Sequence, residues 1–123
     1  MKKSFVHLHS HTEYSMLDGA SRIKEYIRKV KENNQNAAAI TDHGNLYGAL
    51  EFFNTAKEEG INPIIGYEAY LTPGSRFDKP KREENIRYHL TILAENDLGY
   101  SNLINLASKA YTEGYYYKPR IDF

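Results

Sequence analysis

The α/β character of the chain is decided in residues 37–45, which read AAAITDHGN. Residues 37–41 form an apolar run of the length of a buried strand, and the polar DHGN that follows is typical of a loop. Apolar residues then recur at helical spacing over residues 46–56, and Gly60 marks the end of the predicted helix. A buried strand that leads through a polar loop into a helix is the repeating unit of parallel α/β folds.

The same alternation extends on both sides of this unit. Strands are predicted over residues 5–9, 37–41, 61–71 and 88–96, helices over residues 21–33, 46–60 and 103–111, and a last extended segment from residue 113. Residues 72–87 contain two prolines and many charges, so we expect a long exposed loop there. The order predicts a parallel sheet, either open or part of a barrel. A barrel usually needs about 250 residues, so this chain would supply roughly half of one.

The composition is that of one globular domain, with 41% apolar and 26% charged residues among 123. No apolar run approaches the ~18 residues of a membrane span, and no secretory signal is evident, so we expect a cytoplasmic protein without a membrane partner. Cysteine is absent, which excludes disulfides and thiolate metal sites. Sixteen basic and sixteen acidic side chains leave no net charge, and therefore no strongly basic surface for duplex nucleic acid.

Three alternate histidines mark the end of the first predicted strand, in HLHSHTEYSMLDG. Because side chains alternate along a strand, His7, His9 and His11 share one side, and the pattern does not decide which of them would bind an ion. Asp18 follows in the next loop. A single H-x-H pair is more often a pair of solvated or hydrogen-bonded histidines than a metal site.

Later strands add further candidate ligands. Asp42 and His43 follow the second strand directly, although Asp42 could equally be the N-cap of the next helix. Glu68 lies late in the third strand, where a carboxylate among apolar neighbours needs a partner. His89 stands near the start of the fourth strand, the wrong end in a parallel sheet, and could be a core histidine. Because the carboxyl ends of parallel strands meet at one edge, we expect ligands from several strands to converge there.

Imidazole and carboxylate ligands without thiolate suit Zn, Mn or Fe. A carboxylate can also bridge two ions, and two ions about 3.5–4 Å apart activate water and neutralise a phosphoryl oxygen. The residue types therefore predict a centre of one or several divalent metal ions that hydrolyses phosphate esters.

The motifs, in this order, resemble a known family. HLHSHTEYSMLDG, AITDHGNLYGALEFF, GYEAYL, HLTILAENDLGYSNLINLASKAYTEG and YYKPRID are similar to the polymerase and histidinol phosphatase (PHP) domain at the N-terminus of bacterial DNA polymerase III alpha subunits. The resemblance implies a truncated, distorted (β/α)7 barrel, of which residues 1–123 are the N-terminal half or so. The rest of the barrel and the polymerase domains would lie outside this chain. The intact protein would combine DNA-directed DNA polymerase activity with a metal-dependent 3′–5′ proofreading exonuclease.

The resemblance also implies site residues. Six positions match metal ligands of the family: His9, His11, Asp18, His43, Glu68 and His89. Four of these, His9, His11, His43 and Glu68, would also be catalytic. Conversely, the resemblance leaves His7 out, gives Asp42 a supporting role and places Arg120 near the phosphate-binding region. The family's last ligands would follow residue 123, so we expect the chain by itself to bind metal weakly and to have little or no nuclease activity.

The partners implied are those of a replicative nucleotidyltransferase. They are a single-stranded 3′ end of DNA and, through the full-length chain, the sliding clamp and the exonuclease subunit. Two alternatives remain open, namely a non-catalytic docking module of the polymerase and a small-molecule phosphatase with the same metal site. Because part of a barrel leaves an open sheet edge and exposed apolar surface, we also expect the chain to self-associate.

Overall fold

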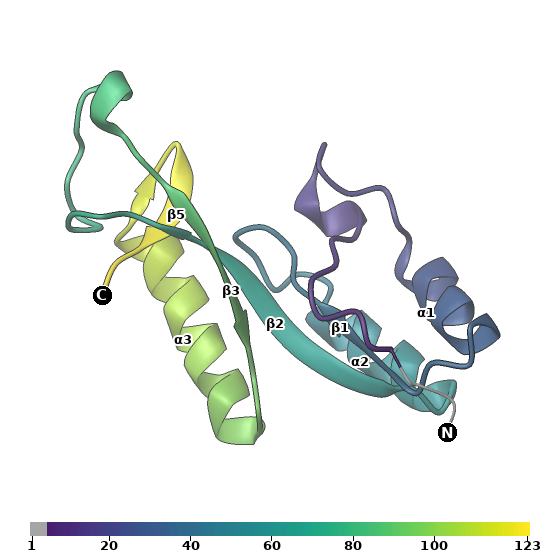
Figure 1. The fold of residues 1–123 in the computed structure, drawn as a ribbon. Helices are drawn as coiled ribbons and strands as arrows, with labels where there is room; N and C mark the ends of the chain where they lie inside the picture. The colour runs from purple at the N-terminus through teal and green to yellow at the C-terminus, as the bar shows by residue number, and fades with distance from the viewer. Residues whose placement is uncertain (1–4) are drawn as a thin grey trace.

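The computed structural model describes residues 5–123 and shows an α/β fold built around one long strand (Figure 1). This strand, β2 (Asn62–Leu71), pairs with three others. β1 (Ala37–Ile40) lies parallel to its first half. β5 (Lys118–Ile121) lies parallel to its last two residues and pairs in turn with the short antiparallel β4 (Tyr115–Tyr116). β2 therefore connects the two ends of the molecule.

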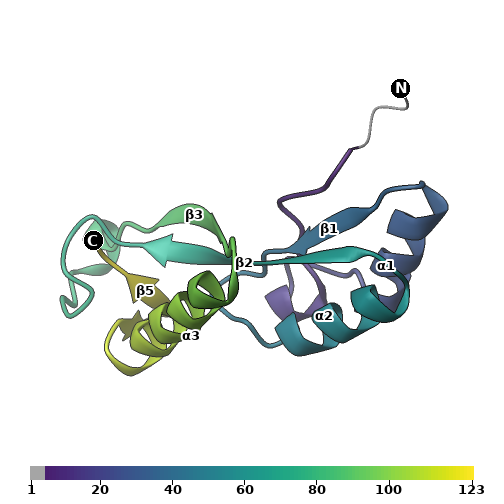
Figure 2. The same ribbon diagram turned by 90° about the horizontal axis from the view of Figure 1, so that it is seen from below.

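The three α-helices within residues 5–123 belong to two separate cores. α1 (Ile23–Glu32) and α2 (Ala49–Glu58) pack with β1 around residues such as Ile27 and Phe52. α3 (Asp97–Thr112) covers the second half of β2 and β5, where Tyr67 is fully buried. Figure 2 shows α2 and α3 on the same side of β2 but apart from each other. None of the helices within residues 5–123 has the length and apolarity that crossing a membrane requires.

The direction of the fourth predicted strand differs from the all-parallel sheet expected from the sequence. β3 (Tyr88–Leu93) runs antiparallel to β2, with His89 opposite Tyr70. The connecting loop contains only the short 3-10 helix η2 (Arg82–Glu84). The prediction was wrong because parallel neighbours need a crossover, usually a helix, whereas strands joined by a loop alone return as antiparallel neighbours.

Element boundaries differ from the expected ones by a few residues. The first predicted strand is an extended segment that lies along β1, with the Ala39 amide donating to the His7 carbonyl at 2.9 Å and the Thr41 amide to the Ser10 carbonyl at 2.9 Å. A 3-10 helix, η1 (Glu13–Ser15), follows it. α2 begins at Ala49, three residues later than expected, and ends before Gly60, whose φ of 71° suits the left-handed end of a helix.

Candidate metal centre

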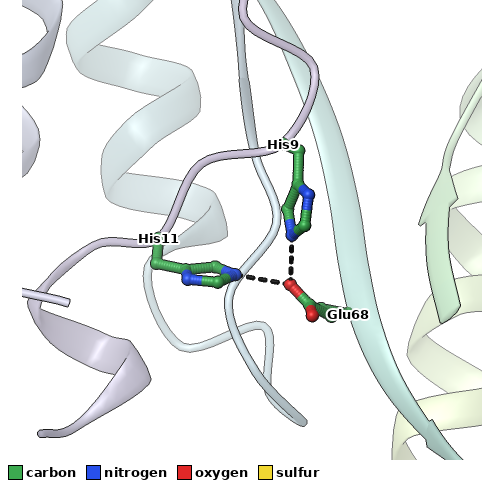
Figure 3. A group of neighbouring side chains, drawn as sticks. All are labelled: His9, His11 and Glu68. Carbon is green, nitrogen blue, oxygen red and sulfur yellow. Dashed lines mark hydrogen bonds and ion pairs between the residues drawn. The ribbon is translucent and has the colours of Figure 1, made fainter. Parts of the chain in front are cut away.

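Glu68 on β2 is the centre of a cluster of four histidines. Its side chain is only 3% exposed. Oε2 lies 2.5 Å from His9 Nε2 and also contacts His11 Nε2, and Figure 3 shows both imidazoles directed at this oxygen. Oε1 lies 3.0 Å from His89 Nδ1 and 3.6 Å from His43 Nδ1. One carboxylate thus gathers imidazoles from the N-terminal segment, the loop after β1, and β3.

Asp18 supplies the second carboxylate of the cluster. Its Oδ2 lies 2.5 Å from His43 Nε2, although its side chain is 68% exposed. His43 therefore lies between two carboxylates, with one ring nitrogen facing each.

All six residues that the sequence motifs single out as ligands are brought together in this cluster. They form three groups, and within each group the potential ligand atoms lie within 4.8 Å of one another. The groups are His9 with His11 and Glu68, His11 with Asp18 and His43, and His43 with Glu68 and His89. Because the groups share members, and Glu68 belongs to two of them, these residues would suit more than one ion.

Backbone pairing fixes the loop of His43 against Glu68. The Glu68 amide donates to the Asp42 carbonyl at 3.0 Å, and the Gly44 amide donates to the Glu68 carbonyl at 2.9 Å. The chain therefore continues the parallel pairing of β1 beyond its end, with His43 opposite Glu68. This places two candidate ligands side by side without depending on their side chains.

The antiparallel direction of β3 explains the position of His89. The sequence places this histidine at the start of its strand, which would lie far from the other ligands in a parallel sheet. Because β3 returns alongside β2, its start lies beside the carboxyl end of β2, and His89 pairs with Tyr70 two residues after Glu68.

Asp42 joins the two loops that carry the ligands. It is 2% exposed and accepts hydrogen bonds from the Thr12 amide at 2.6 Å, the Thr12 hydroxyl at 2.7 Å and the Ser15 hydroxyl at 2.6 Å. The Ser15 hydroxyl accepts in turn from the His43 amide at 3.1 Å. Asp42 is not an N-cap, since Gly48 caps α2. Its oxygens face the loop after His11, so it holds ligand-bearing segments in place.

Two residues considered from the sequence lie outside the cluster. The exposed ring of His7 packs against Phe5, with ring centroids 4.8 Å apart. Arg120 is 1% exposed and donates to three backbone carbonyls, those of Gly114, Arg76 and Asp78. Arg120 therefore anchors the loop after β2, and these three bonds commit most of its donors to the protein itself.

The charge states of the buried ligands suit cation binding. Burial raises the pKa of Glu68, but hydrogen bonds from His11 and His9 outweigh it, and the net pKa is lowered, so the carboxylate stays ionised. Burial lowers the pKa of His43 and, with the smaller effect of His11, outweighs the Glu68 carboxylate, which would raise it. A neutral imidazole beside an ionised carboxylate is the protonation state that metal ligation requires.

His43 also tests whether the site fits a metal ion. Both of its ring nitrogens are buried and neither makes a hydrogen bond of acceptable geometry. Buried polar atoms normally have a partner, and a cation between His43 and the nearby carboxylates would supply one. With nitrogen and oxygen ligands only, the residues fit a divalent ion such as Zn, Mn or Fe.

Tyr70 is a neighbour of the cluster that the sequence did not reveal. Its ring stacks on His43 at an interplanar angle of 19° with centroids 6.0 Å apart, and meets the His89 ring edge-on at 5.2 Å. A tyrosine in an apolar strand gives no signal of such a role. Its only clue is period two, which places it on the same face as Glu68.

The comparison with protein families decides the identity of the fold. Residues 7–123 match the model of the PHP domain. The chain belongs to the PHP domain family. DNA polymerase III subunit alpha of Aquifex aeolicus is 51% identical over the whole of this chain and 11% of its own length. The same subunit of Thermus aquaticus is 52% identical over 98% of this chain and 10% of its own. The resemblance stated above is thus confirmed, and this PHP chain spans about a tenth of the length of these relatives.

Solved structures confirm the fold class. A protein described as a metal-dependent phosphoesterase from Bifidobacterium adolescentis superposes with a TM-score of 0.59 at 19% identity, covering 88% of this chain and 35% of that one. An amidohydrolase from Chromobacterium violaceum gives a TM-score of 0.56 at 22% identity, over 85% and 34% of the two chains. The PHP chain therefore shares the α/β architecture of about a third of each larger protein.

Proposed function

We propose that this chain is the N-terminal part of the PHP domain of a DNA polymerase III alpha subunit, and that its cluster binds divalent metal ions for the hydrolysis of phosphodiesters. In the intact subunit this site acts as a 3′–5′ exonuclease on single-stranded DNA. The observation that carries the proposal is the convergence of four imidazoles on the buried, ionised carboxylate of Glu68.

Each residue of the cluster has a distinct task in this proposal. Glu68, which belongs to two of the groups, would hold ions together with His9 and His11 and together with His43 and His89, and Asp18 would join His11 and His43 in the third group. The ions, when bound, supply an activated water and neutralise the charge of the phosphoryl oxygen. Hydrogen bonds from Thr12 and Ser15 to Asp42 keep the ligand loops from separating when the substrate binds.

The activity and partners proposed for the longer protein are inferred from its relatives. Because about half of the positions are identical to alpha subunits from several bacteria, we propose that the longer protein polymerises DNA and works with the sliding clamp and the exonuclease subunit. These relatives also favour a polymerase over a small-molecule phosphatase. For the chain by itself we propose weak metal binding and little nuclease activity.

Metal analysis tests the proposed centre directly. The purified chain is equilibrated with Zn²⁺ or Mn²⁺ by dialysis and its bound metal is measured at equilibrium, together with His9→Ala, Glu68→Ala and the matched control His7→Ala, whose exposed imidazole lies outside the cluster. We expect bound metal to fall sharply in the first two variants and to stay at the wild-type level in His7→Ala. Equal metal content in all three variants would mean that the cluster is not the binding site.

A nuclease assay separates the remaining alternatives. In an alpha subunit that contains this chain, Glu68→Ala should abolish Mn²⁺-dependent degradation of single-stranded DNA and leave primer extension largely intact. An unchanged exonuclease rate would favour a purely structural or docking role for the domain. Efficient hydrolysis of small phosphomonoesters, without any attack on DNA, would favour the phosphatase instead.

A further inference from the structure

The aromatic ring of Tyr70 is held tightly at the edge of the metal cluster. It contacts two proposed ligands, stacking on His43 and meeting His89 edge-on. On another side the backbone of Gly44 approaches so closely that an added Cβ would lie 2.8 Å from a ring carbon of Tyr70. The half-buried ring is therefore confined by its neighbours, and anything that rests on it is placed relative to the cluster.

Lys118 rests on this ring. Its Nζ lies 5.5 Å from the centroid of Tyr70, the distance of a cation–π contact. Lys118 is exposed, and within residues 5–123 its ammonium has no carboxylate partner and no hydrogen bond. An ammonium on a flexible stem that is held only by a ring keeps its three donors available for another group.

The contrast with Arg120, two residues along the same strand, is informative. Both cations belong to the YYKPRID segment, but Arg120 is buried and donates to backbone carbonyls of the protein. Lys118 instead combines contact with Tyr70, a neighbour of the cluster, with an exposed ammonium. Lys118 is therefore the cation of this segment that a substrate can reach.

A cation near the cluster would help to bind the negatively charged substrate. A phosphodiester chain carries a negative charge on every phosphate, and the ions would contact only the one that is hydrolysed. A lysine near the cluster can bind a further phosphate oxygen as a point charge. On the basis of the function proposed above, we propose that Lys118, positioned by Tyr70, binds a phosphate group of the nucleic acid substrate beside the metal centre.

The test measures phosphate binding and metal binding separately. Thymidine 5′-monophosphate is titrated into the chain by calorimetry at saturating Mn²⁺, with thymidine alone as the control for the phosphate. Lys118→Met should weaken nucleotide binding about fivefold, the loss of one partly exposed charge-assisted contact, and leave Mn²⁺ affinity unchanged. Lys118→Arg should restore most of the nucleotide affinity.

Lys57→Met is the matched control, because Lys57 also rests on an aromatic ring, with its Nζ 5.7 Å from the centroid of Phe53 on α2. We expect it to bind the nucleotide as the wild type does. Unchanged binding by Lys118→Met, or equal losses in both variants, would overturn the inference while the metal analysis leaves the proposed function standing. If the wild type binds no Mn²⁺ at the cluster, the proposed function fails and the inference fails with it.

Discussion

Replacing Asp42 with alanine is expected to destabilise the fold by about 3–5 kcal/mol. Three donors point at this carboxylate, and hydrogen bonds to a charged group contribute about 1.5–3 kcal/mol each. The full sum is not expected, because the hydroxyls of Thr12 and Ser15 can rotate toward other acceptors. The Thr12 amide cannot rotate, and it would be left buried without a partner. The loss is a large share of the 5–15 kcal/mol that stabilises a typical domain.

The Asp42→Asn variant removes the negative charge of the side chain but keeps its size and most of its hydrogen-bonding atoms. Its Oδ1 can still accept from the Thr12 amide and the Ser15 hydroxyl, and the Thr12 hydroxyl can reverse to accept from the new amide. We therefore expect a smaller loss of about 1–2 kcal/mol. Urea unfolding followed by circular dichroism measures both variants, with Asp97→Asn as the exposed control. A loss below about 1 kcal/mol in Asp42→Ala, or equal losses in the two Asp42 variants, would refute the assigned role.

Three further predictions concern other parts of the chain. Gly44→Ala should cost about 2–4 kcal/mol in thermal or urea unfolding, because φ is 64° there and the new Cβ would meet Tyr70. Burial raises the pKa of Asp122, but hydrogen bonds from Arg76 outweigh it, and the net pKa in the folded protein is lowered. This carboxylate therefore stabilises the fold fully above about pH 3.9, and the stabilisation is lost as the pH falls through the lowered pKa of the folded protein. Arg76→Met should flatten that dependence in unfolding measured across acidic pH. Light scattering should show the chain associating through the apolar cavity of about 390 Å³ between α2 and α3, and Phe53→Lys should shift it toward the monomer.

The sequence predicted which polar residues would come together better than it predicted the architecture that brings them together. Glu68 could be singled out because a carboxylate in an apolar strand is locally conspicuous, whereas the choice of His9 and His11 over His7 came from the family resemblance. The role of Asp42 could not be settled in this way. Its partners Thr12 and Ser15 lie 30 and 27 residues away along the chain, and ordinary hydroxyl residues carry no signal of such a bond.

The direction of β3 is the clearest failure of local reasoning. The sequence predicts a strand over residues 88–96, of which the structure forms Tyr88–Leu93, but gives no information on which way it runs. The decisive feature was that residues 72–87 contain no α-helix, which favours an antiparallel return. The antiparallel return also brings His89 to Glu68. The wrong strand direction and the unexpected position of His89 in the sequence therefore have one cause.

The cluster lies between the two hydrophobic cores, so an ion bound there would also affect the stability of the fold. The loop of His43 follows β1, which belongs to the core of α1 and α2, whereas Glu68 and His89 belong to strands that pack with or beside α3. Within residues 5–123, β2 is the main covalent and hydrogen-bonded connection between these cores. An ion held jointly by His43, Glu68 and His89 would cross-link them, because each core supplies part of its coordination. Part of the free energy of metal binding would then oppose unfolding, so that the residues proposed for hydrolysis also hold the two halves of the sheet together.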